Sequence, residues 1–302
     1  MMINLRSLEV FYWVSTLQNF GQAAARLYMT QPAVSQRIST LEEEFGCRLL
    51  ERSARTVQLT PKGRHLLAYA DRLLLLHSEM IREVAAADHL SGVLRLGVSE
   101  TIVQTWLPDF IDRVSRVYPA VTFDIEVDVT PKMKASLLKH ELDLAFLMGP
   151  VAAPDFVDVP LNPFALAFIC NSQTQFNDEV VSAEMLQKYA LITYQKNTAN
   201  YRELQQLFRT ATSSAPRIHA SSSLATIIRM TLSGLGIAVI PPAAVEPELR
   251  RGELRILSTP LNLNPLRFTA SYRLGPGTIL APLLAQIAVE TSSFHAGMHN
   301  DI

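Results

Sequence analysis

The chain has 302 residues, of which 48% are hydrophobic and 18% are charged, and this composition is typical of a globular protein with sizeable cores. Its length suits two or three domains and excludes a single small one. The formal net charge is -1, which excludes a general basic excess, so any contact with nucleic acid must come from a local cluster of cations.

Cysteine usage and hydropathy narrow the class of protein further. The two cysteines, Cys47 and Cys170, are far apart in sequence and form no CxxC pattern, which disfavours a disulfide scaffold or a structural zinc site. No apolar run reaches the length of a transmembrane helix, and residues 1–13 lack the apolar region and cleavage site of a signal peptide. We expect a cytoplasmic protein with no membrane contact, no metal and no cofactor.

The N-terminal segment predicts a helix-turn-helix. Residues 5–18 carry an apolar face and predict a first helix, and residues 22–27 predict a short Ala-rich helix that leaves room for close packing. Thr30 is a good N-cap for a third helix. Pro32 lies in the first turn of that helix, where its missing N–H costs nothing.

The third predicted helix has the features of a recognition helix. Val34, Ile38, Leu41 and Phe45 are expected to form one buried stripe, and the leading half of the opposite face carries short or uncharged side chains with one Arg on its flank. The acids at 42–44 come near the end of the helix, where phosphates would repel them, so only the N-terminal half suits a major groove. The residues that we expect to contact DNA from this helix are Thr30, Gln31, Pro32, Ser35, Gln36 and Arg37.

A basic segment follows this helix. Residues 48–64 predict a wing in which cations surround one acid, Glu51. An ordinary three-helix bundle would share the buried stripe, but it would not explain an acid-free leading half followed by a cationic wing. We expect phosphate contacts from Arg52 and Arg55. The cations of the segment are Arg48, Arg52, Arg55, Lys62 and Arg64.

These residues carry a family resemblance. From Leu5 to Gly63, without gaps, a pattern that includes TQPAVS in the third helix and LLER at the base of the wing resembles the N-terminal domain of LysR-type transcriptional regulators. Two positions depart from that pattern: Gly21 stands where Ser or Thr is usual as an N-cap, and Leu50 stands where Phe is usual. The resemblance implies a winged helix-turn-helix domain over residues 1–60, with double-stranded operator DNA and RNA polymerase as partners.

Residues 61–88 predict one long helix that pairs with a second copy of itself. Apolar side chains repeat with the 4-3 spacing of a coiled coil, and a core helix of a monomer is the weaker alternative because nothing nearby in sequence is expected to pack against it. The resemblance implies that this is the family's dimerisation helix and that dimers pair again through their sensor domains. Residues 89–92 are expected to form a hinge, with Gly92 as its joint. The seam positions are Leu66, Ala70, Leu73, His77, Met80, Val84 and Ala87.

Residues 93–302 alternate predicted strands and helices. A β-α-β-α-β order over about 93–162, followed by a second cycle over about 163–266, predicts two mostly parallel sheets with helices on both faces. Residues 267–302 are expected to return to the first unit as a strand and a final helix. Two linked α/β units of this size look like a periplasmic-binding-protein-like effector domain of two subdomains, which the family resemblance also implies.

Hydroxyl-bearing residues follow several of these strands, at the edge where such sheets bind ligands and helix N-termini attract anions. We therefore expect a small, carboxylate-bearing effector between the two subdomains. The alternative is that each hydroxyl only caps a helix, and Thr130 is expected to be such a cap. Glu100 is discordant, because its carboxylate would oppose a bound anion unless it turns outward or the effector also carries an amino group. The strand ends supply the candidates Ser99, Thr101, Thr130, Lys132 and Ser221, and the resemblance supports Ser99 and Thr130 and adds Asn197 and Tyr201.

Two other functions have less support. An enzyme is disfavoured because the chain has no Gly-rich phosphate loop after a strand, no GxSxG or HExxH motif and no paired His or Cys ligands, and His295 and His299 fall in an expected solvated tail. A thiol redox sensor would need a reactive Cys beside a resolving one, whereas Cys47 and Cys170 resemble buried small hydrophobes. The sequence predicts a ligand-responsive, sequence-specific DNA-binding transcriptional regulator.

Overall fold

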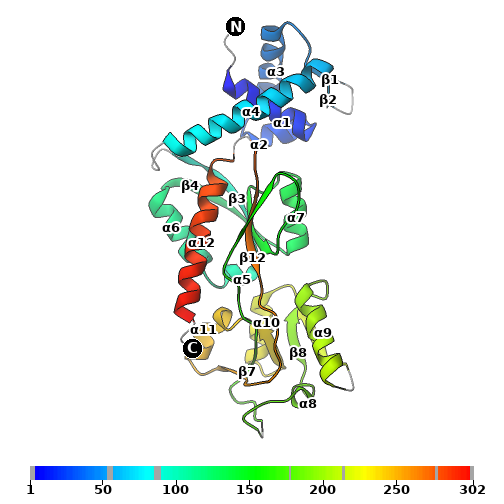
Figure 1. Cartoon of the computed structure of the whole chain (residues 1–302), viewed down its shortest axis with the longest axis vertical. Coiled ribbons are helices and arrows are strands. Elements are labelled where there is room, and N and C mark those ends of the chain that lie inside the picture. The colour runs from blue at the N-terminus through cyan, green and yellow to red at the C-terminus, as the bar shows by residue number, and fades with distance from the viewer. Residues whose placement is uncertain are drawn as a thin grey trace.

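The computed structural model of the chain describes residues 4–52, 57–84, 90–176, 178–212, 215–275 and 278–299. Figure 1 shows a helical head at one end of an elongated molecule, with two α/β units following one another below it. We call these the head, the first unit and the second unit. None of the helices within the described residues has both the length and the apolar character needed to cross a bilayer.

Three short helices form the head, and each begins at a side-chain cap. They are α1 (Leu5–Leu17), α2 (Phe20–Arg26) and α3 (Gln31–Phe45). Thr30 caps α3 as predicted, by accepting a hydrogen bond from Ala33 N at 3.4 Å. The expectation that Gly21 takes the cap position of α2 is wrong: Asn19 caps that helix and accepts from Gln22 N at 2.9 Å, so the cap does not depend on the residue at 21.

The base of the wing is tied to α3 by a carboxylate. Strands β1 (Leu50–Arg52) and β2 (Val57–Leu59) pair antiparallel. Glu42 Oε1, on α3, accepts hydrogen bonds from the backbone N–H groups of Leu49 at 2.8 Å and Leu50 at 3.1 Å. The first acid of the recognition helix therefore fixes the strand that starts the wing.

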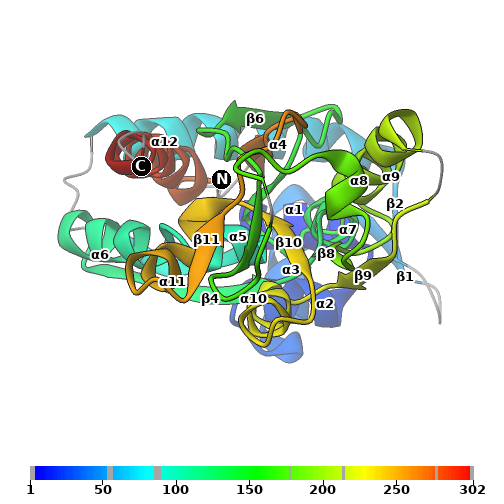
Figure 2. The same ribbon diagram turned by 90° about the horizontal axis from the view of Figure 1, so that it is seen from below.

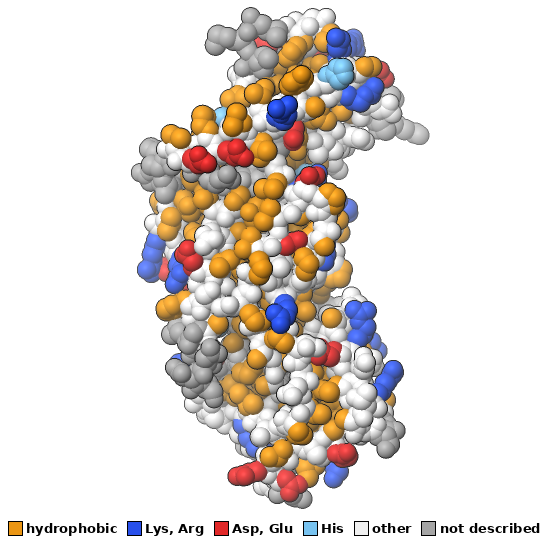
Figure 3. All heavy atoms as spheres, viewed as in Figure 1, with side chains coloured by type: hydrophobic (Ala, Val, Ile, Leu, Met, Phe, Trp, Pro, Cys, Tyr) orange, Lys and Arg blue, Asp and Glu red, His pale blue; other side chains and the backbone are white. Residues whose placement is uncertain are grey.

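The long helix α4 (Pro61–Val84) has two apolar sides. Its inner side, with Ala70 and Leu74, is buried in the head core, and the helix contacts α1 and β2, so the expectation that nothing nearby in sequence packs against it is wrong. Its outer side is an exposed stripe that runs along the helix in Figure 3. Of the predicted seam, Leu73, Met80 and Val84 lie on this stripe, Ala70 lies on the inner side, and Ala87 is outside the described residues. The stripe consists of Tyr69, Leu73, Leu76, Met80 and Val84.

The first unit is a five-stranded sheet covered on both faces. Strand order is β4-β3-β5-β12-β6, with β3 parallel to β4 and β5, and β12 antiparallel to β5 and β6. Helices α6 and α12 pack on one face and α7 on the other, as Figure 2 shows from below. The strands are β3 (Ser91–Val98), β4 (Ala120–Val127), β5 (Leu144–Met148), β6 (Phe156–Pro160) and β12 (Phe268–Arg273), and the helices are α5 (Glu100–Val103), α6 (Leu107–Val117), α7 (Thr130–Leu138) and α12 (Leu280–His299).

The second unit repeats this layered plan. Its sheet has the order β11-β7-β10-β8-β9, in which β8 runs parallel to β9 and β10, and β7 runs antiparallel to its neighbours. Alternate residues of β7 and β10 face α8 and α9 on one side and α10 on the other, as expected for a doubly covered sheet. The strands are β7 (Ala167–Asn171), β8 (Leu191–Tyr194), β9 (Ile218–Ser221), β10 (Ile237–Ile240) and β11 (Leu254–Ile256), and the helices are α8 (Ala183–Leu186), α9 (Ala199–Ala211), α10 (Leu224–Leu232), η2 (Pro242–Val245) and α11 (Glu246–Arg250).

The winged helix-turn-helix, the long helix and the two α/β subdomains agree with the predicted fold class, but two local expectations are wrong: Gly92 as a free joint and His295 in a solvated tail. Gly92 lies inside β3, opposite Val121, although its φ of 145° is one that other residues rarely adopt. Of the other residues in the predicted hinge at 89–92, Ser91 also belongs to β3, Leu90 is buried, and His89 lies outside the described residues. Helix α12 continues to His299, so His295 belongs to a helix and contacts the Phe164 ring rather than lying in a solvated tail.

The Glu42 contact gives a stability prediction. Replacing Glu42 by Ala removes the acceptor of two backbone N–H groups, and we expect the free energy of unfolding of the head to fall by about 2 to 3 kcal/mol. Glu43, its exposed neighbour on the same helix, is the matched control, and Glu43→Ala should change that free energy by less than about 0.5 kcal/mol. Urea unfolding followed by circular dichroism measures both. Equal effects of the two substitutions would contradict a structural role for Glu42.

Candidate DNA-binding surface and effector-binding region

The outer face of α3 is an uncharged ridge at its leading end. Gln31, Pro32 and Gln36 are exposed and Ser35 and Arg37 are half-buried, while the stripe formed by Val34, Ile38 and Leu41 is fully buried beneath them. Thr30 is exposed at the start of the helix, although its hydroxyl already serves as the cap. All six predicted contact residues of this helix therefore lie together on or beside one surface.

Cations flank this ridge at the base of the wing. Arg48, Lys62 and Arg64 are exposed, and Arg64 Nη1 donates to Leu59 O at 2.9 Å. Figure 3 shows Lys and Arg side chains gathered where α4 begins, beside the wing. Arg55 and the side chain of Arg52 lie outside the described residues. An uncharged ridge with cations at its side suits base edges in a major groove and phosphates next to it.

The boundary between the first and second units is closed by Glu100. This residue begins α5, directly after β3, and its carboxylate reaches the N-terminus of α10 in the second unit. It accepts from Leu224 N at 2.6 Å, Ala225 N at 3.2 Å and Ser223 Oγ at 3.2 Å. The carboxylate therefore occupies the place that an anion would take at this helix end. Glu100 neither turns outward nor opposes a ligand there, because it fills that place itself.

A second contact crosses the same boundary next to Glu100. The Thr101 hydroxyl lies 3.1 Å from the hydroxyl of Tyr194, at the end of β8, and Thr101 is buried. Burial raises the pKa of Tyr194, so its phenol keeps its proton and one of the two hydroxyls donates to the other. Thr101, a predicted effector residue, has its hydroxyl engaged across the boundary in this structure.

The other predicted residues of the first unit differ in availability. Ser99 is half-buried at the start of α5, and its side chain makes no capping hydrogen bond there. Thr130 was expected to cap α7, but Val129 takes the cap position. The Thr130 hydroxyl instead accepts a hydrogen bond from Met148 N at 3.0 Å. Lys132 is exposed and pairs with Asp128 and with Glu126, the latter at 2.9 Å, and these carboxylates raise its pKa. Its charge is therefore neutralised within the first unit.

The second unit contributes a group that the sequence did not indicate. Asn200, in the first turn of α9, is only 6% exposed, and its Nδ2 is a buried donor without a hydrogen-bond partner. The predicted residues Asn197 and Tyr201 lie on either side of it, Asn197 exposed and Tyr201 buried. Ser221 is half-buried and its hydroxyl accepts from Ser223 N at 3.1 Å. The first turn of α9 therefore offers backbone N–H donors together with a side-chain donor, Asn200 Nδ2, that lacks an acceptor.

The described residues hold no cluster of three or more His, Cys, Asp or Glu side chains that could bind a metal. Cys170 is buried in the second unit, where burial raises the pKa of its thiol, and Cys47 is half-buried in the head core. The two thiols thus lie in separate cores, and the raised pKa of Cys170 is the opposite of what a reactive cysteine needs.

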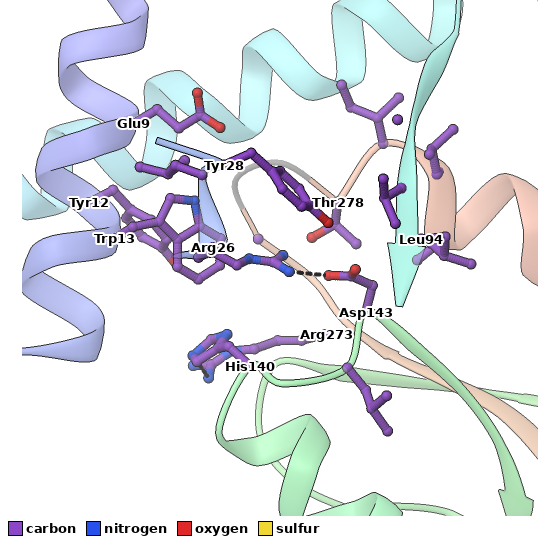
Figure 4. Close-up of a pocket in the computed structure, with 18 of the residues that line it drawn as sticks. Glu9, Tyr12, Trp13, Arg26, Tyr28, Leu94, His140, Asp143, Arg273 and Thr278 are labelled. Carbon is purple, nitrogen blue, oxygen red and sulfur yellow. Dashed lines mark hydrogen bonds and ion pairs between the residues drawn. The ribbon is translucent and has the colours of Figure 1, made fainter. Parts of the chain in front are cut away.

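A junction between the head and the first unit forms a further polar site, which Figure 4 shows in close-up. Arg26, at the end of α2, pairs with Asp143, just before β5, at 2.6 Å. Asp143 also receives a bidentate contact from Arg95, at 2.9 and 3.1 Å. Burial raises the pKa of Asp143, and Arg26 opposes that shift. Arg26 and Asp143 line a cavity of about 330 Å³ between the head and the first unit.

Aromatic rings complete this junction. The Arg26 guanidinium lies 4.6 Å from the centre of the Trp13 ring, and the edge of that ring meets His140 at 5.3 Å between centres. Arg273 Nη1 lies 3.1 Å from His140 Nε2. Burial and the two nearby guanidinium groups lower the pKa of His140 to about 4, so its ring is neutral at physiological pH and accepts from Arg273.

Comparison with known proteins places this architecture in a family. Residues 5–64 match the family described as "Bacterial regulatory helix-turn-helix protein, lysR family", and residues 87–286 match "LysR substrate binding domain". The transcriptional regulator GltR of Bacillus subtilis is 24% identical over 253 residues, covering 84% of each chain. A protein of Streptomyces viridosporus described as "Probable hydrogen peroxide-inducible genes activator" is 30% identical over 253 residues, covering 82% of this chain and 80% of that one.

Solved structures share the fold over nearly the whole chain. Full-length OxyR from Pseudomonas aeruginosa has a TM-score of 0.63 and 24% identity, with 98% of this chain and 96% of that chain covered. Full-length CbnR in complex with its target DNA has a TM-score of 0.54 and 20% identity, with 96% and 100% covered. The matched family is one of transcriptional regulators and not of enzymes. With its helix-turn-helix head and its two α/β units, the chain belongs to the LysR family of bacterial transcriptional regulators.

Proposed function

We propose that the chain is a dimeric regulator that reads its operator with α3 and responds to a small, carboxylate-bearing molecule bound where the two α/β units meet. The observation that carries the DNA-reading part is the exposed ridge of Gln31, Pro32 and Gln36, free of acids and flanked by cations. Base edges in the major groove are read by such short or amide side chains, and phosphates are held by cations beside them.

The outer stripe of α4 supports the dimer. Leu73 is 46% exposed and Val84 is 79% exposed, and a row of apolar side chains this long on one helix favours a second copy of the same helix. A two-fold dimer would place two copies of α3 on two operator half-sites. Pairing of dimers through their sensor units, and contact with RNA polymerase at the promoter, complete the proposed assembly.

The first turn of α9 supports a carboxylate-bearing effector. The N-terminus of α10 is already filled by Glu100, so a ligand anion needs another helix start at the same boundary. Helix α9 begins five residues beyond Tyr194, whose hydroxyl touches the first unit, and Asn200 offers a buried donor in its first turn. We propose that the carboxylate binds this turn, beside Asn197 and Tyr201, and that the rest of the molecule extends toward Ser99 and Thr130.

A thiol-based peroxide sensor is the other candidate, because one relative is described as a peroxide-inducible activator. The two cysteines of this sequence lie in separate cores, and Cys170 has a raised pKa, so no thiol pair is placed for disulfide formation. Effector binding at the boundary accounts for more of the structure.

The DNA surface gives different expectations for base and phosphate contacts. Gln31→Ala or Ser35→Ala should reduce the preference for operator over random DNA by roughly 5- to 100-fold, as loss of a base contact does. Arg52→Ala or Arg55→Ala should weaken both kinds of binding alike and flatten the salt dependence. Fluorescence anisotropy on a genomic fragment selected by the wild-type protein measures all four. Unchanged binding in every variant would mean that DNA contacts another surface.

The α4 stripe gives a prediction for the assembly. Leu73→Glu combined with Met80→Glu places like charges face to face in the proposed seam, and we expect the dimer dissociation constant to rise by at least about 100-fold. Arg209→Glu, exposed on α9 and away from this helix, is the charge-reversal control and should leave the dimer intact. Light scattering over a concentration series gives the mass. A double variant that stays dimeric would rule out this seam.

The effector proposal is tested at Asn200. Replacing Asn200 by Asp exchanges the unpaired donor for a carboxylate and should abolish stabilisation by any small mono- or dicarboxylate that raises the Tm of the wild-type protein. Gln206→Glu adds the same charge on an exposed position of α9 and serves as the control. Thr130→Val is a poorer test, because it also leaves Met148 N without its acceptor. Equal Tm shifts in Asn200→Asp and in the wild-type protein would mean that the ligand carboxylate binds elsewhere.

A further inference from the structure

The head is attached to the first unit mainly through polar contacts. Among the residues that the structure describes, the hydrophobic core of the head and the two cores of the first unit are separate clusters, and Ile81 is the α4 side chain that packs against a core of the first unit. Between these bodies lie the ion pair of Arg26 with Asp143, the ring contact of Trp13 with His140, and the cavity shown in Figure 4. An interface of this kind, without a continuous apolar core, favours separation and redocking of the two parts.

The Arg26–Asp143 pair is built so that it can open. Both side chains are largely buried, with 18% of Arg26 and 16% of Asp143 exposed. Breaking a buried ion pair is normally unfavourable because it leaves one charge without compensation. Here Asp143 keeps its bidentate contact with Arg95 and its hydrogen bond from Arg95 N at 3.0 Å when Arg26 leaves. The departing guanidinium becomes hydrated, so neither charge remains buried and unpaired.

The contact is made to the part of the head that positions the recognition helix. Arg26 is the last residue of α2, and the turn at Leu27–Met29 leads directly into α3. Within this turn, Tyr28 adopts a positive φ of 53°, and Arg6 Nη2 donates to Leu27 O at 3.1 Å. The cation of the pair therefore lies at the end of α2, directly before the turn of the helix-turn-helix.

In the first unit, the Arg26–Asp143 contact is made at the loop that follows α7, a helix that begins at the boundary of the two α/β units. Helix α7 starts at Thr130, whose hydroxyl accepts from Met148 N at the end of β5. The loop at 139–143 joins the opposite ends of α7 and β5 and carries both His140 and Asp143. At 1.5 Å per residue, the nine residues of α7 span about 13 Å between these two places.

We propose that the pair of Arg26 with Asp143, together with the packing of Trp13 on His140, is a releasable lock that docks the DNA-binding head on the first unit of its own chain. Docked, the lock fixes the orientation of α3 relative to the sensor units. Released, it leaves the head joined to them through the end of α4. A regulator with the proposed function would use the docked and released states to give its DNA-binding heads two different orientations. The lock itself requires no ligand.

The lock is tested from both sides in the ligand-free, full-length protein. The sequence has two tryptophans, so Trp106→Phe leaves Trp13 as the only indole and makes it a reporter of the junction. In this background, Asp143→Asn should raise the acrylamide quenching constant of Trp13 about two- to threefold. The second arm reads the first unit: Arg26→Gln should accelerate hydrogen exchange of the amides at 139–143 about tenfold, although the substituted residue is in the head.

Arg116→Gln is the matched control for both arms. It removes a guanidinium that pairs with Asp112 on α6, at 77% exposure and away from the junction, and it should change neither readout. If Asp143→Asn unfolds the first unit through loss of the Arg95 contact, circular dichroism reports it and the Arg26→Gln arm decides, because that variant keeps Arg95 with Asp143. If the amides at 139–143 exchange at the same rate in Arg26→Gln as in the Arg116→Gln control, the lock proposal is wrong. Neither arm uses an effector or DNA, so failure of the proposed function would leave both results standing.

Discussion

The carboxylate of Glu100 determines how the two α/β units face each other. It leaves the first unit at the end of β3 and accepts three hydrogen bonds at the N-terminus of α10 in the second. Such contacts combine the partial positive charge of a helix start with ionic hydrogen bonds, and they are stronger than contacts between neutral groups. The neighbouring contact of Thr101 with Tyr194 depends on the same approach of the units. Any ligand at this boundary therefore binds beside a carboxylate whose charge is already compensated.

Local patterns in the sequence were sufficient to predict most of the fold. The cap at Thr30 and the stripe of Val34, Ile38 and Leu41 predicted α3 because caps and helical periodicity involve residues close together in the chain. The alternation of strands and helices likewise predicted both sheets, since a doubly covered sheet needs apolar strands with amphipathic helices between them. The ridge of predicted DNA contacts followed from the same periodicity, because the residues opposite a buried stripe must face outward.

Contacts between distant segments could not be predicted in this way. Glu100 appeared to oppose a bound anion, because nothing near it in sequence reveals that α10, more than 120 residues later, supplies its donors. The same holds for Arg26 and Asp143, which are joined only when the head docks, and for the burial of Asn200. Short elements such as β11 were missed because three residues carry little periodicity. For Gly21, the family pattern was followed although Asn19, two residues earlier, provides the cap.

Glu42 has a consequence for how the protein meets DNA. By binding the N–H groups of Leu49 and Leu50, it makes the recognition helix and the base of the wing one rigid piece. The conformational entropy of their relative arrangement is thus lost on folding rather than on binding, which raises affinity without adding a contact. Because the two parts cannot adjust separately, a shift by one base pair displaces the helix from its bases and the wing base from its phosphates together. Such rigidity sharpens the distinction between the correct register on DNA and its neighbours.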